Sequence, residues 1–266
     1  RQTWQGPSRI YLRFIGVLES VDYNGGNDEK LANTLKAISR SPHQKIFRYS
    51  AESQSLASRI EAIVNAKVVV TPTIDTSDML PSSQSKPFTI SFPGSARMDK
   101  GFGEISPLFK EVEKISPDLD YQAYLQMLPS RELSQHYESA RQLLVNPRVK
   151  VLPSSVTSDE MIAYMKESHL IVLPYCPKTY KYRSSAIMAE AACLGRQIVA
   201  HAGCGFSDQI QMFGAGIVCK NNPNELARAI VQFANYDRTH LSRLASDARE
   251  KFLNYSQSQY SEFFDQ

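Results

Sequence analysis

The chain has 266 residues, 42% hydrophobic and 21% charged, which is typical of a globular protein with one large or two modest domains. Its net charge of +3 is too small to indicate nucleic-acid binding, so any anion site must come from local placement of charge. The four cysteines form no CxxC pair or metal-like spacing, and no stretch reaches the ~18 to 20 apolar residues of a membrane-spanning helix.

The first 80 residues predict an incomplete α/β unit. Strands are predicted at 10–17, 45–50 and 67–73, and helices at 31–39 and 55–64. Three strands are fewer than the five or six usual for a doubly wound sheet. Residues 75–87 are polar, rich in Pro and Ser and without periodicity, which is typical of an interdomain linker.

From Lys86 onward short apolar runs alternate with helical segments. Helices are predicted after the first run, around Ile105 to Val112, and at 158–168, 184–195 and 222–236, the last three each opening with a Ser or Asn that can cap a helix. Strands are predicted at 88–92, 121–128, 149–152, 169–175, 197–201 and 216–219. This alternation predicts a parallel sheet covered by helices on both faces.

The segment GSARMDKGF, residues 94–102, carries two cations between two glycines. In an open α/β sheet ligands bind at the carboxyl ends of the strands, where this segment lies. Arg97 and Lys100 suit a diphosphate, and Gly94 and Gly101 would let it approach the backbone. A solvated basic turn remains the alternative, and it is favoured when the segment is taken alone.

The segment 173–195 joins a strand end to a helix that begins at Ser184 and Ser185. A helix N-terminus presents unpaired N–H groups and a partial positive charge, which make a phosphate site. Lys178, Lys181 and Arg183 crowd the same loop. Plain helix capping by the two serines is the alternative.

Glu190 lies among apolar helical neighbours three and four residues away. A carboxylate on such a face costs several kcal/mol to bury without a partner. Either a cation from another segment pairs with it, or the hydroxyls of a ribose do. The two interpretations are equally supported by the sequence.

GSARMDKGF, then YRSSAIMAEAACLGRQIVAHAG, then GAGIVCKNNPNELARAI together resemble the C-terminal domain of retaining GT-B glycosyltransferases, a group that includes glycogen-synthase-like and mannosyltransferase-like enzymes. The resemblance covers roughly residues 67–245. It implies an α/β fold of GT-B type: an incomplete N-terminal Rossmann-like domain (1–80), a doubly wound, Rossmann-like nucleotide-sugar-binding domain (81–240) and a C-terminal segment (241–266). The helix of this last segment is expected to run from about Thr239 to Tyr255 and to pack back on the N-terminal part.

The resemblance also assigns roles to residues of this chain. Arg97 and Lys100 would act as the catalytic clamp on the donor diphosphate, and Glu190 would bind the ribose. Tyr182 stands where the family often has a glutamate beside the donor sugar, so the loop with Tyr182 and Arg183 would hold the sugar; Ser95 stands where the family usually has an arginine. The remaining assignments are Gly94, Ser95, Ser184, Ser185 and Ala186 for the diphosphate, and Leu152, Pro153 and Ser154 for the base.

The implied function is transfer of a sugar from a nucleoside-diphosphate sugar, with retention, to a glycan, lipid-linked or small-molecule acceptor. No metal or other cofactor is expected, because no DxD-like acidic pair lies near a strand end.

The glycine-rich loop and catalytic histidine of the family's N-terminal domain are not visible, so a truncated chain is expected. The expected location is the cytoplasm, with peripheral membrane contact through the N-terminal region as an open possibility. The alternatives are a non-catalytic nucleotide-sugar-binding subunit, an inactive truncated domain, or an epimerase-like or phosphorylase-like protein.

Overall fold

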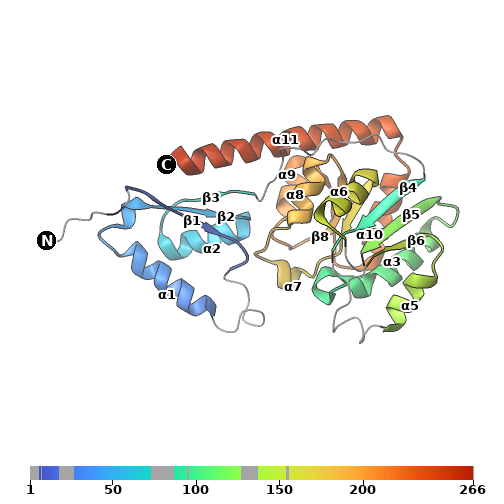
Figure 1. The fold of residues 1–266 in the computed structure, drawn as a ribbon, viewed down its shortest axis with the longest axis horizontal. Helices are drawn as coiled ribbons and strands as arrows, with labels where there is room; N and C mark the ends of the chain where they lie inside the picture. Colours follow the sequence, from blue (N-terminus) through green and yellow to red (C-terminus); the bar gives the residue numbers. More distant parts are fainter. Residues whose placement is uncertain are drawn as a thin grey trace.

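The computed structural model describes residue 6 and residues 8–17, 27–72, 87–94, 96–126, 137–153 and 156–265. Two parallel sheets, one formed by strands between residues 10 and 70 and the other by strands between residues 88 and 219, lie side by side (Figure 1). The predicted linker 75–87 lies outside the described residues except for Pro87. The strands are β1 (Ile10–Phe14), β2 (Phe47–Ala51), β3 (Val68–Val70), β4 (Phe88–Phe92), β5 (Tyr121–Gln126), β6 (Val149–Leu152), β7 (Leu170–Leu173), β8 (Gln197–His201) and β9 (Gly216–Cys219).

The smaller sheet, in the order β1-β2-β3, is the centre of what we term the N-terminal unit, the described residues up to Pro72. Helix α2 (Gln54–Val64) begins where the Ser53 hydroxyl accepts a hydrogen bond from the Leu56 N–H, and it ends at Asn65, whose φ of 50° is left-handed. Its apolar face is buried against the sheet, as the sequence periodicity predicts. Helix α1 (Asn27–Ser39) packs beside it.

The larger sheet has the order β6-β5-β4-β7-β8-β9 and is the centre of the C-terminal unit, the described residues from Pro87 to Asp237. The chain leaves β4 in one direction and returns at β7 to continue in the other, which places a topological switch point between these two strands. Ligands of open α/β sheets bind at the carboxyl ends of the strands at such a point. The strands predicted at 149–152, 197–201 and 216–219 have these limits in the structure.

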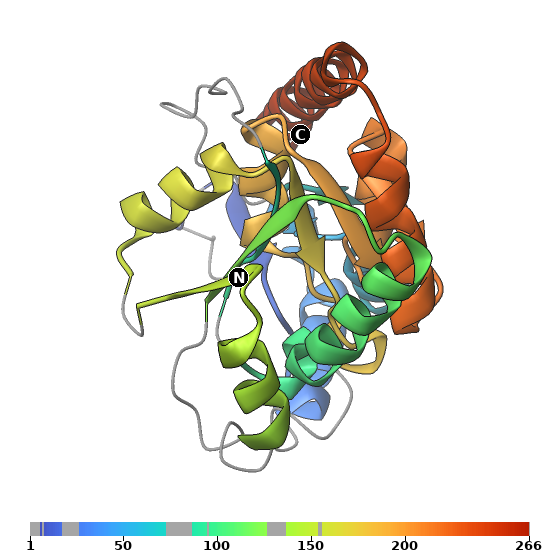
Figure 2. The same ribbon diagram turned by 90° about the vertical axis from the view of Figure 1, so that its right-hand side faces the viewer.

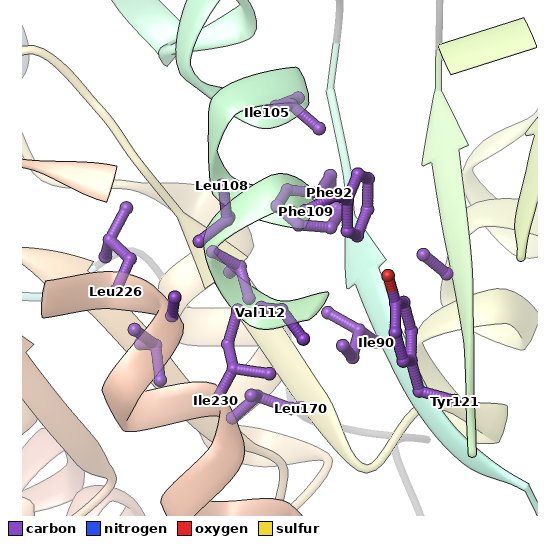
Figure 3. Close-up of a cluster of buried hydrophobic side chains, with 14 of the residues drawn as sticks. Ile90, Phe92, Ile105, Leu108, Phe109, Val112, Tyr121, Leu170, Leu226 and Ile230 are labelled. Atoms are coloured by element: carbon purple, nitrogen blue, oxygen red, sulfur yellow. The ribbon is translucent and has the colours of Figure 1, made fainter. Parts of the chain in front are cut away.

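Helices cover both faces of the larger sheet (Figures 1 and 2). On one face, α3 packs against β4, β5 and α10; Figure 3 shows Phe109 and Val112 of α3 against Ile90, Phe92 and Tyr121. On the other face lie α6, α8, α9 and part of α11. Short helices α5, α7 and α9 were not predicted from the sequence. The helix bounds are α3 (Phe102–Ile115), α5 (Tyr137–Val145), α6 (Ser158–Glu167), α7 (Pro177–Tyr180), α8 (Ala186–Cys193), α9 (Ser207–Phe213), α10 (Pro223–Ala234) and α11 (Arg238–Asp265), with 3-10 turns η1 (Gln44–Ile46) and η2 (Met98–Lys100).

Helix α11 is 28 residues long and runs along both units (Figure 1). Ala248 and Phe252 are buried against the C-terminal unit, while the Tyr260 hydroxyl donates to the Pro72 carbonyl at 2.8 Å in the N-terminal unit. The helix is longer than the segment expected to begin near Thr239 and end near Tyr255, because its last turns have the N-terminal unit to pack on. In the described part of the chain, no helix is both long and apolar enough to cross a membrane.

Candidate donor-binding site

The turn after β4 packs tightly against the residues that follow β7. Gly101 has a φ of 78°, and a Cβ there would lie 1.9 Å from the Pro174 carbonyl oxygen, so only glycine fits. The Cys176 N–H donates to the Asp99 carbonyl at 2.9 Å. The fold therefore brings together the two segments that the sequence analysis singled out separately.

Lys100 is the central cation of this turn. Its ammonium lies 5.7 Å from the centre of the Tyr175 ring, and only 2.8 Å from where a Cβ on Gly94 would be. Burial lowers the pKa of Lys100, the charge of Arg97 lowers it further, and Asp99 offsets part of this effect. No ion pair of Lys100 occurs among the described residues. The ammonium is thus partly desolvated at the switch point and open to an anionic ligand.

Arg97 forms an ion pair with Asp99, a residue to which the sequence assigned no role. Its guanidinium donates from Nε to the Asp99 carboxylate at 2.8 Å, and a second bond from the same group completes a bidentate pair. The two residues are only two positions apart, and the 3-10 turn at η2 lets their side chains meet. Arg97 therefore reaches the site with two of its donors already engaged.

A residue at the end of β5 also supports the turn. The Gln126 side-chain oxygen accepts a hydrogen bond from the Gly94 N–H at 2.7 Å. Gly94, Lys100, Gln126 and Tyr175 line a cavity of about 20 Å³, which has room for roughly one water molecule. A diphosphate must therefore lie outside this cavity. Position 95, the predicted neighbour of Gly94 in the clamp, lies outside the described residues.

The start of α8 forms the other half of the candidate site. The Ser185 hydroxyl accepts from the Met188 N–H at 3.2 Å, so Ser185 does cap the helix, and Ser184 beside it is also buried. The Ala186 and Ile187 N–H groups have no acceptor among the described residues, and Ala186 is exposed. Burial and the neighbouring Tyr180 raise the pKa of the Tyr175 hydroxyl, and the nearby Ser185 side chain lowers it. Tyr175 therefore lies near both Ser185, at the start of α8, and the Lys100 ammonium.

Glu190 lies one helical turn beyond Ala186 and is half-buried, not fully buried. The apolar neighbours on the helix therefore do not enclose the Glu190 carboxylate as the sequence predicted, because one side of α8 remains open to solvent. Leu152 is buried in the same apolar cluster as Met188, whereas Pro153 is exposed. Of the three residues predicted for the base, Ser154 lies outside the described residues.

The loop predicted to hold the donor sugar is attached to the N-terminal unit. The Ser53 hydroxyl donates to the Tyr182 carbonyl at 2.9 Å, and the Ser55 hydroxyl donates to the Lys181 carbonyl at 2.8 Å. Tyr182 packs against the apolar cluster of the N-terminal unit, while the Arg183 guanidinium lies 5.6 Å from the centre of the Tyr180 ring. No local sequence pattern could have indicated the two serines, because 126 or more residues separate them from the loop.

No protein-family model matches the chain, and no curated protein matches it. Solved structures do. A sucrose-phosphate synthase from Thermosynechococcus elongatus is 14% identical with a TM-score of 0.65, over 90% of this chain and 61% of that one. TarM of S. aureus, in complex with Fondaparinux, alpha-GlcNAc-glycerol and UDP, is 18% identical with a TM-score of 0.68, over 97% and 50%. HepE of Anabaena, in complex with UDP and glucose, is 16% identical with a TM-score of 0.64, over 97% and 71%.

The chain therefore spans between half and about 70% of the length of these three proteins. At identities of 14 to 18%, the similarity concerns the fold. The TarM and HepE matches each cover 97% of this chain, so they take in both of its parallel sheets and its long C-terminal helix. The chain has the fold of the GT-B glycosyltransferases, as its sequence motifs predicted.

Proposed function

We propose that the chain binds a nucleoside-diphosphate sugar at the switch point and, with an acceptor, transfers the sugar with retention of configuration. The observation that carries the proposal is that Lys100 and Ser185, the N-cap of α8, both lie near the same side chain, Tyr175. A partly desolvated ammonium and a helix N-terminus are both suited to phosphate oxygens. The bound UDP in the TarM and HepE structures is consistent with this reading of the fold.

In the proposed reaction the bond between the sugar and the β-phosphate breaks, and negative charge develops on the leaving diphosphate. Lys100 and the Ala186 and Ile187 N–H groups would stabilise that charge more in the transition state than in the bound substrate. Glu190, one turn into α8, would accept hydrogen bonds from the ribose hydroxyls. Pro153, exposed at the end of β6, would border the base.

This chemistry assigns the stabilisation of the leaving group to protein cations and N–H groups, so we expect transfer without an added metal or other cofactor. The donor is a nucleotide sugar, and the acceptor is a glycan, a lipid-linked sugar or a small molecule. We place the activity in the cytoplasm or at the cytoplasmic face of a membrane.

Thermal unfolding with UDP, GDP, ADP and TDP tests the proposal, with the matching nucleosides as controls. A ligand at 100 times its dissociation constant stabilises a protein by ~2.7 kcal/mol, so at least one diphosphate should raise the Tm. Lys100→Met should reduce the increase in Tm strongly, whereas Lys251→Met, on the exposed side of α11, should leave it unchanged. An unchanged Tm with all four diphosphates would refute the donor site.

Two alternatives give other outcomes. A nucleotide-sugar epimerase would turn over its substrate without any acceptor. A binding subunit would retain the diphosphate effect but show no turnover in the complete protein.

A further inference from the structure

Two cations from different units lie near the same tyrosine ring, Tyr182, at the junction beside the proposed donor site. The Arg59 guanidinium, on α2, lies 4.7 Å from the centre of the Tyr182 ring, and the Lys181 ammonium lies 5.4 Å from the same centre. Tyr182 is two residues before Ser184, at the start of α8. Figure 1 shows α7, which ends just before this loop, on the side of the C-terminal unit that faces α2.

The two cations are held in place by the backbone around them. Ser55 is one helical turn before Arg59 on the same face of α2, and its hydroxyl donates to the Lys181 carbonyl at 2.8 Å. The Ser53 hydroxyl does the same for the Tyr182 carbonyl. Arg59 and Lys181 are therefore brought to one place by bonds that do not use their own charges.

Neither cation has a carboxylate partner within ion-pair distance in the described part of the chain. The acidic residues nearest to Arg59 in the sequence are engaged elsewhere. Glu61 accepts a hydrogen bond from the Val68 N–H at 2.9 Å, and the buried Glu52 accepts one from the Gly16 N–H at 2.9 Å. Two cations that converge without a counter-charge are the electrostatic pattern of an anion site.

The Tyr182 hydroxyl reports the same local field. Burial raises the pKa of Tyr182, but hydrogen bonding by Arg59 and the charges of Arg59 and Lys181 outweigh burial and bring the pKa below its ordinary value of 10.0. A positive potential strong enough to act on a phenol acts equally on a ligand oxyanion placed there.

We infer that Arg59, Lys181 and Tyr182 form a second anion-binding site, which takes a phosphate group of the acceptor next to the donor. This inference rests on the proposed function for the identity of the ligand, although not for the presence of the site. Arg59 comes from the N-terminal unit and Lys181 from the loop that leads to the start of α8. An acceptor phosphate held by both would place its sugar beside the donor, and a guanidinium with an ammonium suits a tetrahedral oxyanion.

Inorganic phosphate tests the site directly, without a nucleotide or an acceptor. The protein carries Lys100→Met, so that the proposed donor site does not contribute, and its tyrosines are labelled at the ring carbon that bears the hydroxyl. The Tyr182 resonance, assigned with Tyr182→Phe, should shift saturably as phosphate is added. Arg59→Gln and Lys181→Gln should each weaken this binding about tenfold, as expected for loss of one charge-assisted contact.

Lys251→Gln is the matched control, because it removes one charge from an exposed position on α11 and should leave the titration unchanged. No saturable shift, or the same shift in the Arg59 and Lys181 variants as in the control, would overturn the inference. The Tm of each variant shows that it is folded. Because Lys181 is exposed, Lys181→Gln provides a second test if Arg59→Gln is unstable.

Steady-state kinetics with the complete protein identify the source of the phosphate. Arg59→Gln should raise the KM for a sugar phosphate about tenfold, and leave unchanged the KM for the same sugar without phosphate and the affinity for a nucleoside diphosphate. If Arg59→Gln weakens nucleoside diphosphate binding as much as Lys100→Met does, the cations belong to the donor site and the inference is wrong. If no diphosphate binds at all but phosphate still shifts Tyr182, the proposed function fails and the anion site stands.

Discussion

At the scale of single residues, the candidate site is decided by which charges are already paired. Lys100 and Arg97 lie three positions apart in one turn. Among the described residues, Arg97 forms an ion pair with a carboxylate, that of Asp99, and Lys100 forms none. A cation that must give up a partner before it binds a phosphate gains less from that phosphate. The structure therefore separates two residues that the sequence treats as equivalent.

The first prediction compares these two cations. Lys100→Met should weaken nucleoside diphosphate binding by ~1.5 to 3 kcal/mol, the value of a hydrogen bond to a charged group. The double variant Arg97→Gln/Asp99→Asn removes the ion pair as a neutral unit and should cost less than ~1 kcal/mol, because its cation is already satisfied. Calorimetric titration measures both, with the nucleoside as control. Equal losses of binding free energy in the two variants would show that Arg97 also binds the diphosphate.

The second prediction concerns Glu190. If it binds the ribose, Glu190→Gln should lower nucleotide affinity by ~1.5 to 3 kcal/mol and leave the ligand-free protein nearly as stable as before, since the residue is half-buried. If it instead pairs with a buried cation, the same change should cost ~3 kcal/mol of stability or more. Chemical denaturation beside a nucleotide titration distinguishes the two. A large stability loss with unchanged affinity would end the ribose assignment.

The third prediction is a pH dependence from His169, which immediately precedes β7. Burial, then Arg238 and Arg196, lower the pKa of His169 from 6.5 to about 4. Its Nδ1 accepts from the Thr89 N–H at 2.9 Å, so protonation there breaks that bond. The depressed pKa means that stability is complete above pH 6.5 and is lost as the pH falls toward 4, by about 3 kcal/mol.

Denaturation midpoints measured across this range check the His169 prediction. His169→Gln has no group that titrates there, so its stability should fall less steeply between pH 6.5 and 4. Parallel curves for the two proteins would assign the acid sensitivity to another group. A structural role for His169 agrees with its 3% exposure and its bond to β4.

At the scale of elements, the site exists because two loops pack into each other. The turn after β4 and the loop after β7 touch at Gly101 and Pro174, and the Cys176 N–H ties the loop to the Asp99 carbonyl. This packing places Lys100 near Tyr175, and Tyr175 also lies near Ser185 at the start of α8. A change at the contact should therefore disturb the site without touching any residue proposed to bind the ligand.

The fourth prediction uses Gly101→Ala with Gly214→Ala as the matched control. Both glycines have left-handed φ values, 78° and 65°, so both substitutions add backbone strain of ~1 kcal/mol. Only at Gly101 would the new Cβ meet backbone, 1.9 Å from the Pro174 oxygen, whereas nothing lies within 4 Å at Gly214. Gly101→Ala should be the more destabilising by ~2 kcal/mol or more and should also weaken diphosphate binding. Equal effects in chemical denaturation would show that the two loops can move apart.

At the scale of the whole molecule, the two units are joined by the junction loop and by α11. The described N-terminal unit has three strands and two α-helices, which is small for a separately stable domain. The last turns of α11 supply it with Phe263, which is 3% exposed and lies 5.3 Å from Tyr11 between ring centres. The N-terminal sheet therefore depends on the far end of the chain.

The fifth prediction tests this dependence. Phe263→Ala should destabilise the N-terminal unit by ~3 kcal/mol or more, the usual effect of removing a buried phenylalanine ring. Hydrogen exchange should then quicken in β1, β2 and β3 and stay unchanged in the six-stranded sheet. Phe264→Ala is the matched control, because Phe264 is 53% exposed. Equal exchange in both variants would mean that Phe263 does not stabilise the N-terminal unit. Faster exchange in both sheets would mean that the two units do not unfold separately.

By itself, the sequence determined the fold class, most strands of the larger sheet and the two loops that carry the candidate site. These features are local, because β-rich runs, helix caps and glycine turns act within a few residues of the chain. The tertiary structure alone decided which cations are paired and which carbonyls Ser53 and Ser55 bind. It also decided that Tyr182 faces the N-terminal unit and that α11 extends to Asp265. Each of these depends on residues far apart in the sequence, whose proximity follows from how the sheets and helices pack.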